Sequence, residues 1–137
     1  RKMRAYGGAT ALEDLARQWV WIQGKAGQIT ITPDGIGSHW SSRVQVDVVA
    51  LNWKTHDILL GECKWGTDRV DRQVVRELVE NKTPLVLRDL PEGKAGWKVH
   101  YALFSRSGFT PAASVEVQRV QGLLVDLTNI DSVLGHE

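Results

Sequence analysis

The sequence predicts an α/β domain in which helices pack on a mixed central sheet. The first observation is the order of the predicted elements, which is helix, three strands, helix, strand, helix and strand. That order is typical of a sheet covered by helices. The second observation is composition, because 137 residues with 42% apolar and 24% charged side chains suit one globular domain with one core. We therefore expect residues 1–137 to form a single domain and, since the chain begins at Arg1 rather than methionine, to be a fragment of a longer protein.

The first helix is predicted over residues 10–23, with Thr10 as its N-cap. Apolar side chains recur there at helical spacing and are expected to face the core. They are Leu12, Leu15, Ala16, Trp19 and Ile22. Residues 28–32 (QITIT) alternate as a strand that ends at Pro33. The glycine- and serine-rich stretch 34–43 is predicted to be a loop, and Trp40 within it is a candidate for stacking on an unpaired base.

The remaining elements are two strands of a hairpin, two helices and two further strands. Residues 44–51 and 57–64 are apolar runs that predict the hairpin. Residues 68–81 predict a helix capped by Asp68, and residues 99–104 a buried strand. Thr110 and Pro111 start a helix of about ten residues that reaches Gln121, and residues 122–127 form a last strand. Arg106, in the loop after residues 99–104, could contact a phosphate or local carbonyls.

Charged residues interrupt the apolar hairpin at Asp47, Glu62 and Lys64. Residues two apart in a strand share a face, so Glu62 and Lys64 are expected on one side of the sheet. If the turn is centred between residues 54 and 55, opposed residues have numbers that sum to 109. Asp47 then faces Glu62, with Cβ atoms about 4.5–5.5 Å apart. Such carboxylates repel unless positive charge lies between them, and hard oxygen ligands suit Mg²⁺ or Mn²⁺.

A structural ion pair at a sheet edge is the alternative interpretation of these three residues. The triplet Glu-x-Lys is unspecific by itself, because it occurs at Glu62, Glu80 and Glu92. The triplets at Glu80, near a helix end, and Glu92, in a predicted loop, are interpreted as solvated charge. Only the triplet at Glu62 ends an apolar strand and has an acid in register on the neighbouring strand, which favours the metal site.

This chain carries Glu13 on its first predicted helix, then Asp47 on one strand and Glu62-x-Lys64 on the next. This arrangement resembles the PD-(D/E)xK nuclease superfamily. That superfamily shares a restriction-endonuclease-like α-β-β-β-α-β core, which the predicted order matches, with an additional C-terminal helix and strand. The segments VDVVA, ECKW and YALFSRSGFT are further similar to the domain found C-terminal to archaeal-type P-loop ATPases. Val46 stands where the proline that names the superfamily would be.

The resemblance implies roles for particular residues. Asp47, Glu62 and the backbone carbonyl of Cys63 would be ligands of Mg²⁺ or Mn²⁺, and Glu13 would be the helix acid near the metal. Lys64 would be the catalytic lysine, and Gln73 a polar residue near the site. For Glu13 the sequence itself offers an alternative, because residues 10–13 also read as a capping box in which Glu13 bonds the amide of the cap residue.

The resemblance implies a metal-dependent endonuclease that cuts DNA and works with a P-loop ATPase, upstream in the chain or in trans; a homodimer is left open. A single cysteine favours a reducing compartment, so we expect the protein in the cytoplasm. A catalytically silent DNA-binding or docking module of the ATPase is the alternative, and RNA as substrate is not excluded. Net charge of +1 neither requires nor excludes a nucleic-acid partner. The lone Cys63 excludes an intramolecular disulfide framework, and no apolar run approaches the roughly 20 residues of a membrane span.

Overall fold

The computed structural model describes residues 10–41, 43–91 and 96–135, and the side chains of Thr10, Ala11 and Trp40 lie outside the described part. A five-stranded sheet forms the centre, in the spatial order β1-β2-β3-β4-β5. The strands are β1 (Gly35–Trp40), β2 (Gln45–Asn52), β3 (Asp57–Lys64), β4 (Lys98–Ser105) and β5 (Leu123–Asp126). The pairs β1–β2 and β2–β3 are antiparallel, whereas the pairs β3–β4 and β4–β5 are parallel. The sheet is therefore mixed, as predicted.

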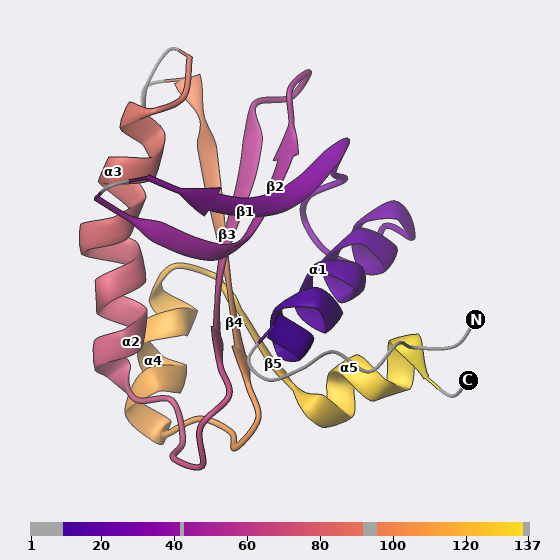
Figure 1. Ribbon diagram of the computed structural model, residues 1–137, viewed down its shortest axis with the longest axis vertical. Coiled ribbons are helices and arrows are strands. Elements are labelled where there is room, and N and C mark those ends of the chain that lie inside the picture. Colours follow the sequence, from indigo (N-terminus) through magenta and orange to yellow (C-terminus); the bar gives the residue numbers. More distant parts are fainter. Residues whose placement is uncertain (1–9, 42, 92–95, 136–137) are drawn as a thin grey trace.

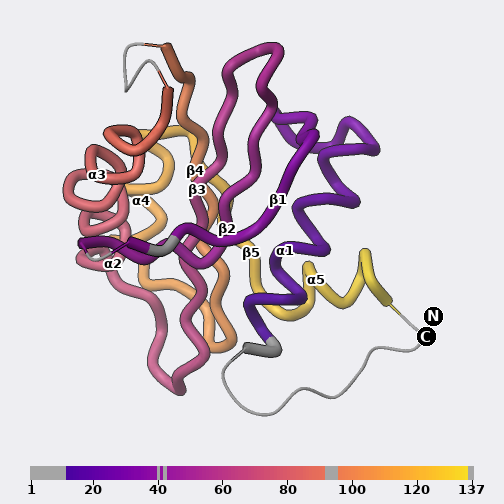
Figure 2. The backbone as a smooth tube through the Cα atoms, turned by 45° about the horizontal axis from the view of Figure 1, so that its top comes forward, coloured from indigo at the N-terminus to yellow at the C-terminus, as the bar shows by residue number. Residues whose placement is uncertain are grey.

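Helices cover both faces of this sheet (Figure 1). One face carries α1 (Thr10–Lys25) and α5 (Leu127–Leu134). The other carries α4 (Pro111–Arg119) and a continuous helical stretch of three parts, α2 (Arg72–Arg76), the π-helix η1 (Glu77–Lys82) and α3 (Thr83–Arg88). The turned view in Figure 2 shows the same two layers. The α-β-β-β-α-β order and the following helix and strand confirm the predicted fold class, and α5 is an addition that the sequence did not predict. None of the described helices is long and apolar enough to cross a membrane.

The first strand lies in the stretch that was predicted to be a loop. Strand β1 (Gly35–Trp40) pairs with β2 from Gly35–Leu51 to Trp40–Gln45, so the prediction of a strand at residues 28–32 was wrong. Weak local propensity at the edge of a sheet is overridden when a neighbouring strand supplies hydrogen-bond partners. Residues 28–32 instead run irregularly, with Ile31 fully buried against the core of the α1 face.

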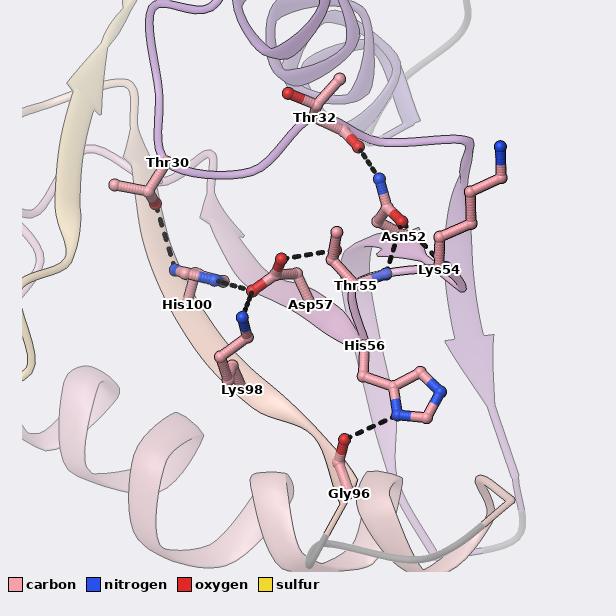
Figure 3. A network of polar contacts seen from close by, with 10 residues as sticks. All are labelled: Thr30, Thr32, Asn52, Lys54, Thr55, His56, Asp57, Gly96, Lys98 and His100. Carbon is pink, nitrogen blue, oxygen red and sulfur yellow. Dashed lines mark hydrogen bonds and ion pairs between the residues drawn. The ribbon is translucent and has the colours of Figure 1, made fainter.

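Polar contacts at one end of the sheet hold this irregular segment in place (Figure 3). The side-chain amide of Asn52 donates to the carbonyl of Thr32 at 2.7 Å. His100 lies between Thr30 and Asp57, with Nδ1 3.1 Å from the threonine hydroxyl and Nε2 2.9 Å from the aspartate carboxylate. These contacts link the segment to β2, β3 and β4, which explains why its alternating pattern does not become a strand.

The helical stretch after β3 begins later and ends later than predicted. Asp71, not Asp68, caps it by accepting from the amide of Arg72. Val70 pairs instead with Phe109 in an isolated bridge, and residues 68–70 are not helical. The helical stretch continues past residue 81 and through Pro84, because the preceding π-turn widens the helix where the proline lacks an N–H.

Two details of the other helices also differ from the prediction. Helix α1 buries Leu12, Ala16 and Trp19 as expected, but Ile22 is 41% exposed and Val20 is fully buried in its place. Helix α4 starts at Pro111 with the hydroxyl of Thr110 accepting from the amide of residue 113, which confirms the predicted cap. It ends at Arg119, two residues before the expected end. The two apolar layers position β3 between them.

Candidate active site

The end of β3 places polar side chains on the face covered by α2 and η1. Cys63 is buried in the core of the opposite, α1-covered face, so Glu62 and Lys64 share a side as the strand period predicted. Both line one cavity of about 300 Å³. Its other lining residues come from the helical stretch and are Gln73, Val74, Glu77 and Lys82. The structure thus brings together the predicted residues Glu62, Lys64 and Gln73.

The numbers of paired residues in β2 and β3 sum to 109, as predicted. The ladder of pairs ends one pair before the predicted pair of Asp47 and Glu62. Pairs run from Asn52–Asp57 to Val48–Gly61. On the other edge of β2, Gly37 pairs with Val49 and His39 pairs with residue 46, so two steps on β1 oppose three on β2. Strand β2 therefore carries one extra residue, a β-bulge of the kind that re-aims side chains beside functional sites.

Core packing confirms this bulge, because Val46 and Val48 pack on opposite faces although they lie two residues apart. Asp47 sits between them and does not continue the ladder opposite Glu62. Its Oδ2 accepts a hydrogen bond from the backbone N–H of Cys63 at 2.9 Å. Contrary to the prediction, Asp47 therefore does not face Glu62 in the ladder but contacts the backbone amide of Cys63, the residue after Glu62.

Arg17 of α1 supports the bulge from the opposite face. Its Nη1 donates to the backbone carbonyl of Asp47 at 2.7 Å, and its Nη2 pairs with Asp14 at 2.7 Å. Because a bulged residue loses its regular ladder partner, this carbonyl needs another donor. The guanidinium satisfies it and fixes the position of Asp47.

Glu62 is the most constrained acid of the site. Only 7% of the residue is exposed. Burial raises the pKa of its carboxyl and the negative charge of Asp47 adds to this, while the hydrogen bond and charge of Lys82 and the charge of Lys64 oppose it. The Nζ of Lys82 donates to Oε2 at 2.7 Å. The other oxygen, Oε1, is buried and has no hydrogen-bond partner among the described residues.

Glu13 contributes a second buried carboxylate oxygen from α1, since its Oε1 also lacks a partner among the described residues. Burial raises the pKa of the Cys63 thiol, and the negative charges of Asp47, Glu13 and Glu62 raise it further. The three acids are therefore close enough for their charges to act on Cys63. The capping-box alternative for Glu13 involves Thr10, whose side chain lies outside the described part.

The oxygens of these acids are of the kind that a hard divalent cation prefers. A buried carboxylate oxygen without a partner is costly, and a cation satisfies it. Within the described ranges, no three His, Cys, Asp or Glu side chains converge closely enough to form a complete metal cage. Mg²⁺ usually keeps several waters and is held by one or two carboxylates, so a small number of acidic side chains is compatible with it. Glu62 lines the cavity, whereas Asp47 is not among its lining residues.

Lys82 is the functional candidate that the sequence analysis missed. The triplet at Glu80 was interpreted as solvated charge, which was wrong for Lys82, because this lysine contacts Glu62. The triplet at Glu92 lies outside the described residues. A signal was present, because Lys82 follows the buried Leu78 by four residues and therefore shares its helix face. The predicted helix ended at residue 81, which hid this relation.

Comparison with protein families finds a match over residues 2–78 to DUF234, described as "Archaea bacterial proteins of unknown function". The chain belongs to this family. No curated protein matches the sequence of this DUF234 member. Among solved structures, it is similar to the "crystal structure of a repair endonuclease from Pyrococcus abyssi", with 15% sequence identity and a TM-score of 0.49. The similarity covers 91% of this chain and 49% of that one, so the DUF234 chain spans about half the length of that structure.

Proposed function

We propose that this chain hydrolyses phosphodiester bonds of DNA with Mg²⁺ or Mn²⁺ at the end of β3, next to the cavity that faces the α2–η1 helix. One observation carries the proposal. Glu62 is buried with an unpartnered oxygen, and it lies beside the charge of Asp47 in a cavity that Lys64 and Lys82 also line. Buried carboxylate oxygens without a partner are uncommon in native proteins, and an oxygen ligand to an ion is one explanation of them. A bound cation would give this buried oxygen the partner that it lacks.

Asp47 and Glu62 would hold the cation, with the backbone carbonyl of Cys63 and the carboxylate of Glu13 as further oxygen donors. When bound, such a cation polarises a phosphoryl oxygen and lowers the pKa of a coordinated water. The amide of Cys63 and the guanidinium of Arg17 keep Asp47 in place. Ligands that are fixed in this way lose little conformational entropy on binding.

The side chains of the cavity would orient the phosphate and the attacking water. Lys64 is exposed at the strand end and close enough to act on the charge of Glu62. We assign it to neutralising the charge that develops on the phosphate in the transition state. Gln73, on the opposite wall, offers an amide for a phosphate oxygen or a water. The hydrogen bond and charge of Lys82 favour the ionised form of Glu62, against the burial that raises its pKa.

The test measures cleavage of plasmid and linear DNA by the purified chain with Mn²⁺. Asp47→Ala and Lys64→Ala are expected to abolish cleavage, while Lys54→Ala, in the exposed β2–β3 turn at the far end of the sheet, keeps it. Circular dichroism and thermal melting check that each variant folds. Cleavage retained by either site variant at the rate of the Lys54 control rejects the assignment.

A catalytically silent DNA-binding or docking module is the second candidate. The existing Lys82–Glu62 ion pair favours it, because the ammonium group of Lys82 already neutralises one carboxylate oxygen of the site. Calorimetry with Mn²⁺ separates the two functions: binding that Glu62→Gln removes supports the nuclease, and no binding supports the module. A P-loop ATPase partner rests on the sequence resemblance alone, and pull-down with that class of ATPase tests it. Competition between DNA and RNA tests the choice of nucleic acid.

A further inference from the structure

Trp65 and Arg106 form an exposed pair at the ends of β3 and β4, and Trp65 directly follows Lys64 of the candidate active site in the sequence. Trp65 follows Lys64, the last residue of β3, and Arg106 follows Ser105, the last residue of β4. Lys64 and Ser105 are register partners in this parallel pair. The two following residues therefore meet at the carboxyl ends of adjacent parallel strands, where α/β sheets generally bind ligands.

The aromatic ring is both exposed and held in place. Trp65 is 38% exposed. The guanidinium carbon of Arg106 lies over the ring, 5.5 Å from its centroid. Such a cation–π contact at an exposed site is weak by itself, so it does not explain why a tryptophan remains in solvent. It does hold the ring beside a cationic group.

Backbone contacts make the two loops that carry this pair a fixed surface. The amide of Arg106 donates to the carbonyl of Lys64 at 3.1 Å. The hydroxyl of Ser107 donates to the carbonyl of Gly66 at 2.8 Å. Within the described residues Arg106 makes no ion pair with an acid, and its charge is available to a ligand. A rigid aromatic next to an available cation is a typical arrangement for binding single-stranded nucleic acid.

We propose that the pair of Trp65 and Arg106 binds an unpaired nucleobase next to the phosphate that enters the cavity. The inference rests on the proposed function and deepens it, because it names the substrate class as DNA with a single-stranded region, such as a flap or an overhang. Bases inside a continuous duplex are already stacked on their neighbours and offer no free face to the ring. The guanidinium would contact the adjacent phosphate, as an exposed Arg does in nucleic-acid grooves.

Trp53 is the matched control for this proposal. It is 48% exposed, more than Trp65, and it packs edge-on against Trp97 with ring centroids 5.2 Å apart. It lies in the turn between β2 and β3, at the other end of β3 from Lys64. A general effect of removing an exposed tryptophan would appear in both variants, whereas a stacking site beside the cavity appears only at Trp65.

The experiment measures fluorescence anisotropy of labelled oligonucleotides with the purified chain in EDTA, so that no strand is cut. The probes are a single strand, a blunt duplex and a duplex with an overhang, at one stated salt concentration. Trp65→Ala is expected to weaken binding of the single strand and the overhang by roughly 5- to 100-fold, the usual effect of losing one stacked base. Trp65→Phe retains most of the affinity, and Trp53→Ala equals wild type.

Equal binding by wild type and Trp65→Ala, or an equal loss in Trp53→Ala, overturns the stacking site. These outcomes are separate from those of the nuclease test. Trp65-dependent binding without any cleavage in Mn²⁺ supports the stacking site and rejects the hydrolase. Cleavage that needs Asp47 but is indifferent to Trp65 and to single-stranded regions does the reverse. An RNA strand of the same sequence is the last probe, and tighter Trp65-dependent binding of it overturns DNA as the ligand.

Discussion

Removing Lys82 tests the electrostatics of the site most directly, because it leaves the buried Glu62 without its cation. The two charged atoms lie 2.7 Å apart, and the side chains are 22% and 9% exposed. Breaking a fully buried ion pair from one side costs about 3–5 kcal/mol, and an exposed pair about 0–1 kcal/mol. Since Lys82 reaches the cavity and keeps a fifth of its surface in solvent, we expect Lys82→Ala to lower the free energy of unfolding by about 2–3 kcal/mol near pH 8.

The size of this loss depends on pH in a defined direction. Burial raises the pKa of Glu62, and the loss of Lys82 raises it further because the lysine opposes that shift. A carboxyl with a raised folded-state pKa contributes stability at low pH, and this contribution disappears as the pH rises through that pKa. The variant is therefore closest to wild type near pH 5, where more of Glu62 is protonated, and furthest from it near pH 8.

Urea unfolding followed by circular dichroism in EDTA measures the free energy of unfolding of both proteins near pH 5 and near pH 8. The matched control is Lys98→Ala, since Lys98 pairs with Asp57 at 3.8 Å and is 69% exposed, so at most about 0.5 kcal/mol is expected. The double variant Lys82→Ala/Glu62→Gln should regain part of the lost stability, because no buried charge remains. A loss in Lys82→Ala no greater than in the Lys98 control, or one that is equal at both pH values, would refute this reasoning.

Three further predictions concern the rest of the fold. Gly61→Ala would place a Cβ 3.0 Å from atoms of Phe104 and Val48, so it should lower the free energy of unfolding in urea by about 1–3 kcal/mol. The control is Gly37→Ala, whose Cβ would meet nothing within 4 Å. An equal loss in both variants would contradict the packing argument. Burial opposes ionisation of Asp57, but hydrogen bonds and nearby charges outweigh it and lower its pKa, so Asp57→Asn should cost about 1–3 kcal/mol at pH 6. This cost should shrink as the pH falls below about 4 through the folded-state pKa, and a constant difference in thermal melting from pH 7 to acid would refute it. Burial of the Cys63 thiol raises its pKa, so a maleimide should label the chain only after denaturation, and rapid labelling of the native protein would count against the buried position.

Local patterns predicted the hairpin and its register because its turn is stabilised by short-range contacts. The side chain of Asn52 accepts hydrogen bonds from the amides of Lys54 and Thr55, which fixes which residues of β2 and β3 are opposed. The alternation of side chains along a strand then places Glu62 and Lys64 on one face. Helix α1 and the Thr110–Pro111 start of α4 were equally predictable, since periodicity and capping are local properties.

The sequence by itself thus determined the order of the elements and the face on which Glu62 and Lys64 lie. Strand β1, the bulge at Asp47 and the contact of Lys82 with Glu62 were decided only by tertiary structure. Each of these depends on a partner far away in the chain: β1 on the edge of β2, the bulge on β1 and Arg17, and Lys82 on a π-turn that carries the helix past Pro84. Hydrogen bonds and charges between distant segments are energetic terms that no local window of sequence contains.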